Sequence, residues 1–259
     1  MGEFVRSEQI GQVRIWTLDR PSARNAIDDR VVAELEALLD EAERDRTLRA
    51  VILTGGGDAA FLSGADLKLL SGGNAELRAE VDRRVLAVTQ RIEALPLPVF
   101  AALNGPVLGG GNEVALACDV RIAEEHATVT FKHAALSVTP GWGGLVRIVR
   151  AIGPSAASKL FYSAQPIDAQ EAKRLGFYDE VVPKGGSRAR ALELASAVEQ
   201  TSASAVADLK RMIKLAAQNE LTQDEETRVF LARTVSRDHQ EALAAFREKR
   251  KPSYEPRSS

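Results

Sequence analysis

The sequence predicts an α/β protein in which a core of repeated strand–helix units is followed by a helical C-terminal region. Short apolar runs alternate with segments of helical spacing as far as Phe131, and from about Gly144 onward the pattern is almost wholly helical. Strands that alternate with helices in this way indicate parallel βα units. We therefore divide the chain into a core of residues 1–200 and a helical region of residues 201–259.

The first elements are expected to form one such unit. Residues 3–8 and 12–18 alternate like strands around a turn at Gly11. Val31, Leu35, Leu38 and Leu39 then recur at helical spacing, and residues 49–54 form a short apolar run that three glycines close. This order of strand, helix and strand predicts a parallel βα unit.

The same pattern then repeats and gives way to helices. A helix over residues 77–95 is expected to end before Pro96, a strand follows at 99–103, and a glycine-rich segment at 107–118 becomes helical. Short strands are expected at 120–123, 128–131 and 180–182. The remaining predicted helices cover residues 144–152, 155–163, 168–175, 188–200, 203–217 and 222–248.

The composition excludes several classes of protein. The chain has 259 residues, 45% of them hydrophobic, and a net charge of only −2, so it carries no general electrostatic footprint for nucleic acid. A lone cysteine, Cys118, excludes an intrachain disulfide, and no Cys/His group has the spacing of a metal site. No apolar run approaches the roughly 20 residues of a membrane span. We expect a cytoplasmic protein with no metal and no membrane or nucleic-acid partner.

Two loops carry the residues expected to do chemistry. Residues 60–68 (AFLSGADLK) lie between a predicted strand and a helix, and Gly64 permits a backbone conformation that lets a ligand approach the N–H of Ala65. Taken alone, this segment is equally compatible with an ordinary turn into a helix.

The second loop, residues 104–113 (NGPVLGGGNE), opens a predicted helix with three glycines. Unpaired N–H groups at the positive end of a helix dipole favour developing negative charge. A phosphate-binding P-loop is the obvious competitor, but its Lys-Ser/Thr ending is missing, and so is the GxGxxG spacing of a dinucleotide fold.

Together the two loops resemble the signature loops of the enoyl-CoA hydratase/isomerase, or crotonase, family. The resemblance covers essentially the whole chain. Further matching segments are Arg20-Pro21 with Asn25-Ala26, Pro140 with Gly143-Gly144, residues 167–172 running to Gly176, Val181-Val182-Pro183, and residues 245–252.

The resemblance implies a ClpP/crotonase-like spiral of repeated ββα units and a helical C-terminal region used to assemble homotrimers or hexamers. It also implies an acyl-CoA substrate, with coenzyme A present only as part of that substrate and no tightly bound cofactor. By position, the N–H groups of Ala65 and Gly110 are the oxyanion-hole donors. Expected substrate and coenzyme A contacts are Arg24, Ala26, Ser63, Gly64, Asp66, Leu67, Gly109, Pro140 and Trp142.

Two further residues are expected to act on protons. Glu113 matches the first of the two glutamates used by family hydratases, and a carboxylate near a bound enoyl thioester can serve as general base and then acid. The place of the second glutamate falls on His133, where hydratases usually have a Pro-Glu pair. Histidine transfers protons near neutral pH, so His133 is a candidate to replace the missing acid.

Three activities remain open on the sequence. The leading hypothesis is hydration of an enoyl-CoA by Glu113 with help from His133. The alternative is decarboxylation of a malonyl-type or glutaconyl-type CoA thioester, because Phe131, His133, Pro140 and Trp142 are together similar to the family's ethylmalonyl-CoA decarboxylases. The third is a non-catalytic member that binds coenzyme A or RNA.

Overall fold

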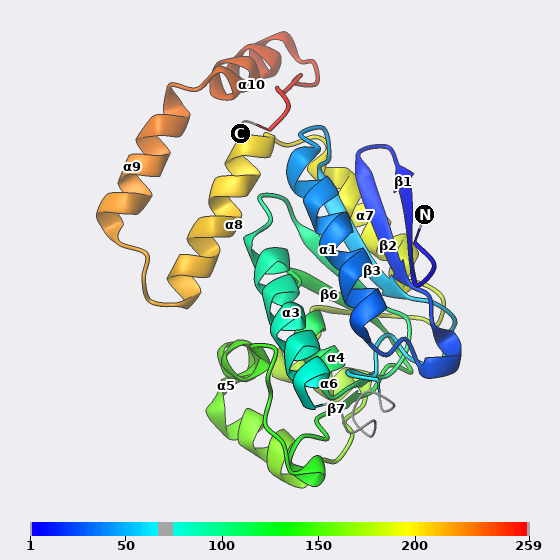
Figure 1. Cartoon of the computed structure of the whole chain (residues 1–259). Coiled ribbons are helices and arrows are strands. Elements are labelled where there is room, and N and C mark those ends of the chain that lie inside the picture. Colours follow the sequence, from blue (N-terminus) through cyan, green and yellow to red (C-terminus); the bar gives the residue numbers. More distant parts are fainter. Residues whose placement is uncertain (1, 67–74, 258–259) are drawn as a thin grey trace.

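The computed structural model describes residues 2–66 and 75–257, and a six-stranded sheet forms its centre (Figure 1). The strand order is β1-β2-β3-β4-β6-β8; β1 pairs antiparallel with β2, and the other neighbours are parallel. The sheet strands are β1 (Val5–Ile10), β2 (Val13–Leu18), β3 (Ala50–Gly55), β4 (Val99–Leu103), β6 (Val120–Glu124) and β8 (Glu180–Val182). The short strands β5 (Val107–Leu108) and β7 (Val129–Thr130) pair separately.

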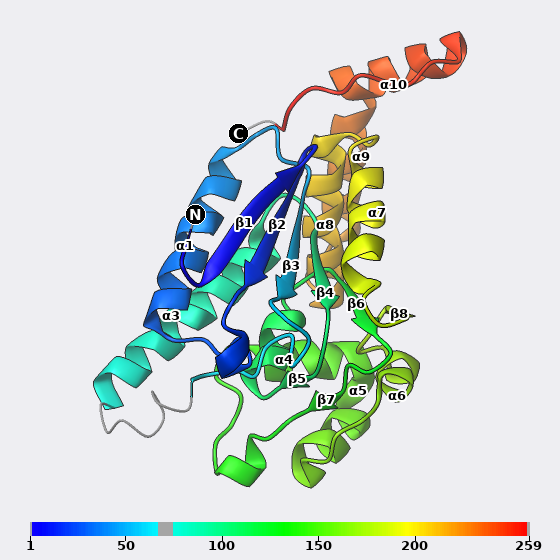
Figure 2. The same ribbon diagram turned by 90° about the vertical axis from the view of Figure 1, so that its right-hand side faces the viewer.

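Helices cover both faces of this sheet (Figure 2). Successive strand residues point to opposite faces, so Ile15 and Ile52 pack with Ala191 of α7 (Ser187–Val198). Their neighbours Trp16 and Leu53 join the larger cluster under α1 (Asp29–Arg44) and α3 (Ala75–Ala94). Because both faces are covered, the central strands are apolar almost throughout, as the short runs in the sequence predicted.

The loops after β3 and β4 lead into the site. The loop after β4 passes through β5 into the short helix α4 (Gly110–Ala115), and a 3-10 turn at η2 (Ala134–Leu136) precedes α5 (Gly144–Ser163). Gly153, at φ 78°, breaks α5 just before Pro154, so the expected division into two helical pieces is confirmed. A further 3-10 turn, η1 (Pro21–Ala23), lies between β2 and α1.

The C-terminal region is helical, as expected, but one predicted helix is wrong. The continuous helix expected over residues 222–248 is two helices, α9 (Gln223–Thr234) and α10 (Arg237–Glu248), because the Ser236 side chain accepts the N–H of His239 and starts a new helix. Helices α6 (Ala169–Leu175) and α7 come before them in the chain. Together with α8 (Ala203–Ala217), α9 and α10 form an arm that extends from the core (Figure 1). In the part of the chain that the structure describes, every helix is too short or too polar to cross a membrane.

Candidate active site

The two glycine-containing loops lie side by side. Phe61 N–H donates to the carbonyl of Pro106 at 3.0 Å, and Leu108 N–H donates to the carbonyl of Leu62 at 3.1 Å. Gly64 has φ 95°, and a Cβ atom there would lie 2.9 Å from the nitrogen of Gly110. Only glycine at position 64 lets the loops approach this closely.

The approach places two backbone donors next to each other. Ile27 N–H donates to the Gly64 carbonyl at 2.8 Å and Asp66 N–H donates to the Ile27 carbonyl at 2.9 Å, so Ala65 is held from both sides while its own N–H is unused. Gly110 is the first residue of α4, where N–H groups have no partner within the helix. Among the described residues, neither the Ala65 nor the Gly110 N–H has an acceptor.

Trp142 packs directly on the second loop. A Cβ atom on Gly110 would lie 2.3 Å from the Trp142 ring, so the indole covers the space that a side chain would take. The indole Nε1 donates to Asp82 at 2.9 Å, and the Trp142 carbonyl accepts from Thr89 at 2.9 Å and Arg147 at 2.8 Å. These bonds fix the ring from α3 and α5, and Trp142 therefore forms a rigid wall against Gly110.

Glu113 is a buried carboxylate that backbone donors orient. It is 2% exposed, and its Oε2 accepts the N–H groups of Trp142 and Gly144, each at 2.8 Å. Its Oε1 lies 3.3 Å from Nε2 of His133. Since Oε2 already accepts two donors, Oε1 is the oxygen left to exchange a proton with a ligand or with His133.

His133 completes this pair from the other side. The side chain is buried, with its ring 6.2 Å from that of Phe131 and 5.6 Å from that of Phe161, centroid to centroid. Its Nδ1 has no hydrogen-bond partner within the described part of the chain. The structure thus brings Glu113 and His133 into contact although 20 residues separate them in the sequence.

The other expected contacts surround the first loop. Arg24 is exposed, with its backbone at φ 51°, and it is the Arg24 carbonyl that contacts the loop, by accepting the N–H of Ser63 at 3.1 Å. Ala26 is buried, Pro140 is half-buried, and Gly109 caps α4 without a side chain. Leu67 lies outside the described residues.

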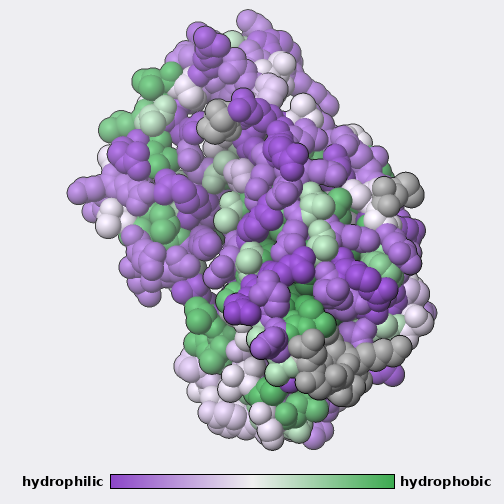
Figure 3. All heavy atoms as spheres, in the orientation of Figure 1, coloured by the Kyte–Doolittle hydropathy of each residue, from purple (hydrophilic) through white to green (hydrophobic). Residues whose placement is uncertain are grey.

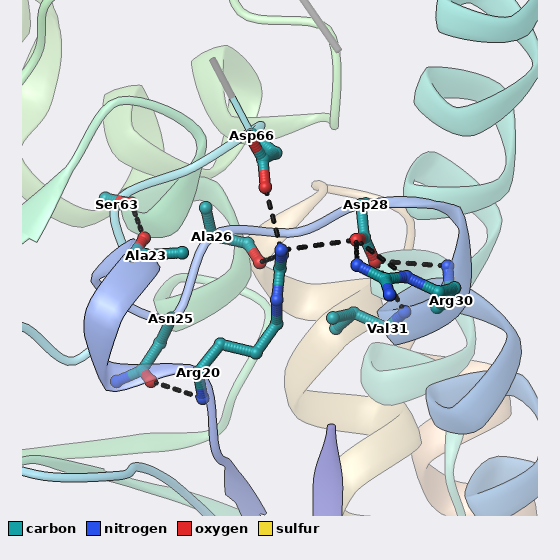
Figure 4. Close-up of polar contacts among 9 residues, drawn as sticks. All are labelled: Arg20, Ala23, Asn25, Ala26, Asp28, Arg30, Val31, Ser63 and Asp66. Atoms are coloured by element: carbon teal, nitrogen blue, oxygen red, sulfur yellow. Dashed lines mark hydrogen bonds and ion pairs between the residues drawn. The ribbon is translucent and has the colours of Figure 1, made fainter. Parts of the chain in front are cut away.

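Sequence reasoning did not assign site roles to two residues that hold the first loop. Asn25 is buried at φ 58°, and its amide donates to the carbonyls of Gly56 at 3.0 Å and Ala60 at 2.8 Å. The Arg20 guanidinium contacts Asp66 and the Ala26 carbonyl (Figure 4). In the sequence, both residues belong to segments that match the family. For Asn25, a polar side chain beside a turn was the pattern that could have indicated a role in holding the loop.

Cys118 takes no part in this arrangement. The residue is buried, and burial, with a smaller contribution from Asp119, raises the pKa of its thiol to about 12. The thiol therefore stays protonated, as is typical of a cysteine that packs in the core.

Comparison with known proteins identifies the fold and the family. The family model for enoyl-CoA hydratase/isomerase matches residues 8–257. The short-chain-enoyl-CoA hydratase of Clostridium acetobutylicum is 35% identical over 94% of each chain. The 2,3-dehydroadipyl-CoA hydratase of Escherichia coli is 34% identical over 99% of this chain and 100% of its own.

A solved structure agrees with the sequence comparisons. The crystal structure of an enoyl-CoA hydratase from Bacillus anthracis superposes with a TM-score of 0.93 at 34% identity, covering 97% of this chain and 99% of that one. The predicted crotonase fold is thereby confirmed. The chain belongs to the enoyl-CoA hydratase/isomerase family of the crotonase superfamily.

Proposed function

We propose that this protein is a lyase that reversibly adds water to the double bond of an enoyl-CoA thioester. The observation that carries the proposal is a pair of backbone N–H groups, on Ala65 and Gly110, that have no acceptor among residues 2–66 and 75–257. The loop with Gly110 leads directly to the buried Glu113. The hydratase names of the relatives support the same reaction and do not favour the decarboxylase alternative.

In the proposed mechanism the thioester oxygen accepts both N–H groups. Water attacks the β-carbon, its oxygen forms the new C–O bond, and the electron pair of the double bond moves to the thioester as an enolate. The two donors stabilise this charge, which is greater in the transition state than in the substrate. Glu113 takes one proton of the water through Oε1 and then gives it to the α-carbon, which completes the product and returns Glu113 to its carboxylate form.

His133 assists this proton transfer in our proposal. Its Nε2 lies 3.3 Å from Oε1 of Glu113, within reach of a proton that the carboxylate has received. The fixed Oε2, held by Trp142 and Gly144, keeps the reactive oxygen turned toward the histidine. A second carboxylate at position 133 is therefore not required.

Cofactor use, subunit assembly and cellular setting are also part of the proposed function. Coenzyme A enters only with the substrate, and the chemistry needs no further bound cofactor. Exposed apolar side chains include Tyr162 on α5, Phe230 on α9, Val235 at the end of α9 and Phe246 on α10. Patches over α5 and α9 are visible in Figure 3. They support assembly into a homotrimer or hexamer, and the reaction and the single buried thiol fit a cytoplasmic setting.

Hydration of crotonyl-CoA, followed by loss of the absorbance of the conjugated thioester, tests the proposal. Glu113→Gln should lower kcat by about 10²–10⁴-fold, because the amide keeps the hydrogen-bonding shape but cannot take the proton. Glu125→Gln makes the same chemical change at an exposed position; it is the control and should retain full kcat. Absence of turnover by folded wild-type protein that still binds coenzyme A would contradict hydration.

A further inference from the structure

A single arginine joins three segments beneath the first loop (Figure 4). Nη1 of Arg20 donates to the carbonyl of Ala26 at 2.6 Å. Nη2 lies 2.9 Å from Oδ2 of Asp66 and 3.3 Å from Oδ2 of Asp28. Arg20 comes from the end of β2, Asp28 caps α1, and Asp66 ends the described part of the first loop.

These contacts enclose the peptide that carries the Ala65 N–H. Ile27 makes backbone hydrogen bonds with Gly64 and Asp66, on either side of Ala65. Arg20 binds Ala26, the residue before Ile27, and Asp66, the residue after Ala65. A shift of the guanidinium would therefore move both sides of the bridge. The contact is indirect, since Arg20 reaches neighbours of the donor and not the donor itself.

These contacts of Arg20, here called the clamp, lie in surroundings that strengthen them. The side chains of Arg20, Asp28 and Asp66 are only 13%, 11% and 12% exposed, so their attraction is poorly screened by solvent. The Phe4 ring lies against the guanidinium, with 5.7 Å from its centroid to Cζ. A planar guanidinium donates in several fixed directions at once, which a lysine ammonium on its flexible stem does not reproduce.

From this geometry we infer that Arg20 is a positioning residue for the Ala65 N–H, and that it aligns this donor with the Gly110 N–H for the developing enolate. The inference rests on the proposed function, because it assigns Arg20 a task in the same oxyanion hole. It predicts that a change at Arg20 acts mainly on the transition state and little on binding of the coenzyme A part of the substrate.

The first measurement is kcat and KM of Arg20→Lys with crotonyl-CoA. A misplaced donor should lower kcat by about 10–100-fold, whereas KM should change by less than about 3-fold. Asp66→Asn removes the same ion pair from the other side and should lower kcat by a similar factor if Arg20→Lys fails to fold. Equal kcat in wild type and a folded variant would overturn the inference.

Arg30→Gln is the matched control. Arg30 also binds Asp28 and lies over the Phe4 ring, 4.2 Å from its centroid. Within the described residues Asp28 is the one carboxylate that it contacts, and its side chain is 55% exposed. Its loss should leave kcat unchanged. A similar fall in kcat for Arg30→Gln and Arg20→Lys would mean general loosening of this region, and would overturn a specific role for Arg20.

A second readout separates this inference from the hydration proposal. Acetoacetyl-CoA forms an enolate whose ultraviolet absorbance reports polarisation by the two N–H donors without any addition of water. Arg20→Lys should lose this absorbance at saturating ligand, and Arg30→Gln should keep it. If the wild type gives the enolate signal but does not hydrate crotonyl-CoA, hydration fails and the comparison of the two variants still decides the positioning role. If the wild type hydrates crotonyl-CoA but Arg20→Lys keeps the full enolate signal of the wild type, hydration stands and the positioning role fails.

Discussion

At the scale of single residues, glycines make room for the groups that surround the site. A Cβ atom on Gly111 would lie 2.1 Å from the Leu62 carbonyl oxygen, and one on Gly144 would lie 2.3 Å from Cγ of Glu113. Gly144 also donates its N–H to Glu113 at 2.8 Å. The carboxylate thus depends on the absence of a side chain at the residue that binds it.

Gly144→Ala should therefore displace Glu113. The added methyl group overlaps a side chain held by two backbone donors, and such overpacking costs about 1–3 kcal/mol of stability. The misplaced carboxylate should lower kcat by about 10²-fold. Gly141→Ala is the control, because no atom of the described residues lies within 4 Å of a Cβ atom there. Both variants would be measured by steady-state kinetics and urea unfolding. Equal kcat and equal stability of the two would show that Gly144 does not position Glu113.

At the scale of elements, the start of α1 is linked to the first loop. Oδ1 of Asp28 accepts the N–H groups of Arg30 and Val31, and Oδ2 of the same side chain lies within 3.3 Å of Arg20. Burial alone raises the pKa of Asp28, but the Val31 N–H, Arg30 and Arg20 together outweigh it, so that its pKa lies below the ordinary 3.8. The cap and the clamp share one ionised carboxylate.

This lowered pKa predicts a loss of stability in acid. The unfolded state takes up a proton at Asp28 at a higher pH than the folded state does. The contribution of ionised Asp28 to the free energy of unfolding is therefore complete above about pH 4 and is lost as pH falls through the lower pKa of the folded state. Asp28→Asn keeps a good helix cap but cannot ionise. Urea unfolding across this pH range should show a shallower acid decline for Asp28→Asn than for wild type, and parallel curves would contradict the prediction.

At the scale of the whole molecule, the C-terminal region is tied back to the core at both ends. Lys210 of α8 lies 2.7 Å from Asp119 and donates to the carbonyls of Ile92 and Leu97. Near the other end, Arg257 is buried and its Nη2 donates to the carbonyls of Ala42, Glu43 and Asp45 at the end of α1. The division into residues 1–200 and 201–259 stays a prediction, and these contacts cross it.

Arg257→Met should destabilise the folded chain. Three carbonyls at the C-terminal end of α1 would lose their donor, which costs about 1–3 kcal/mol when such groups stay buried. Arg237→Met is the control, since that side chain is 88% exposed and its ion pair is an exposed one with Glu255 at 3.2 Å. Urea unfolding at one protein concentration should separate the two variants; equal free energies of unfolding would show that Arg257 does not anchor the tail.

Much of the fold could be predicted from local patterns. The apolar runs at β3 and β4 and the helical spacing of α1 marked buried strands and a covering helix correctly. A strand covered on both faces is apolar throughout, and a helix that packs on a sheet buries one stripe of its surface. Gly64 and the three glycines before Glu113 marked both loops. The break between α9 and α10 was not predicted, because the helical spacing of apolar residues continues across Ser236. That residue acts as a helix cap only where the chain turns.

The sequence by itself determined the family, through its resemblance along the whole chain, and the two glycine-containing loops, because these depend on residue type and order within short segments. Only the tertiary structure decided that Arg20 binds Asp66, that Trp142 covers Gly110 and that Gly144 holds Glu113. These partners are 46, 32 and 31 residues apart in the chain. Contacts at such separations depend on how whole elements pack, and no periodicity within one element specifies them.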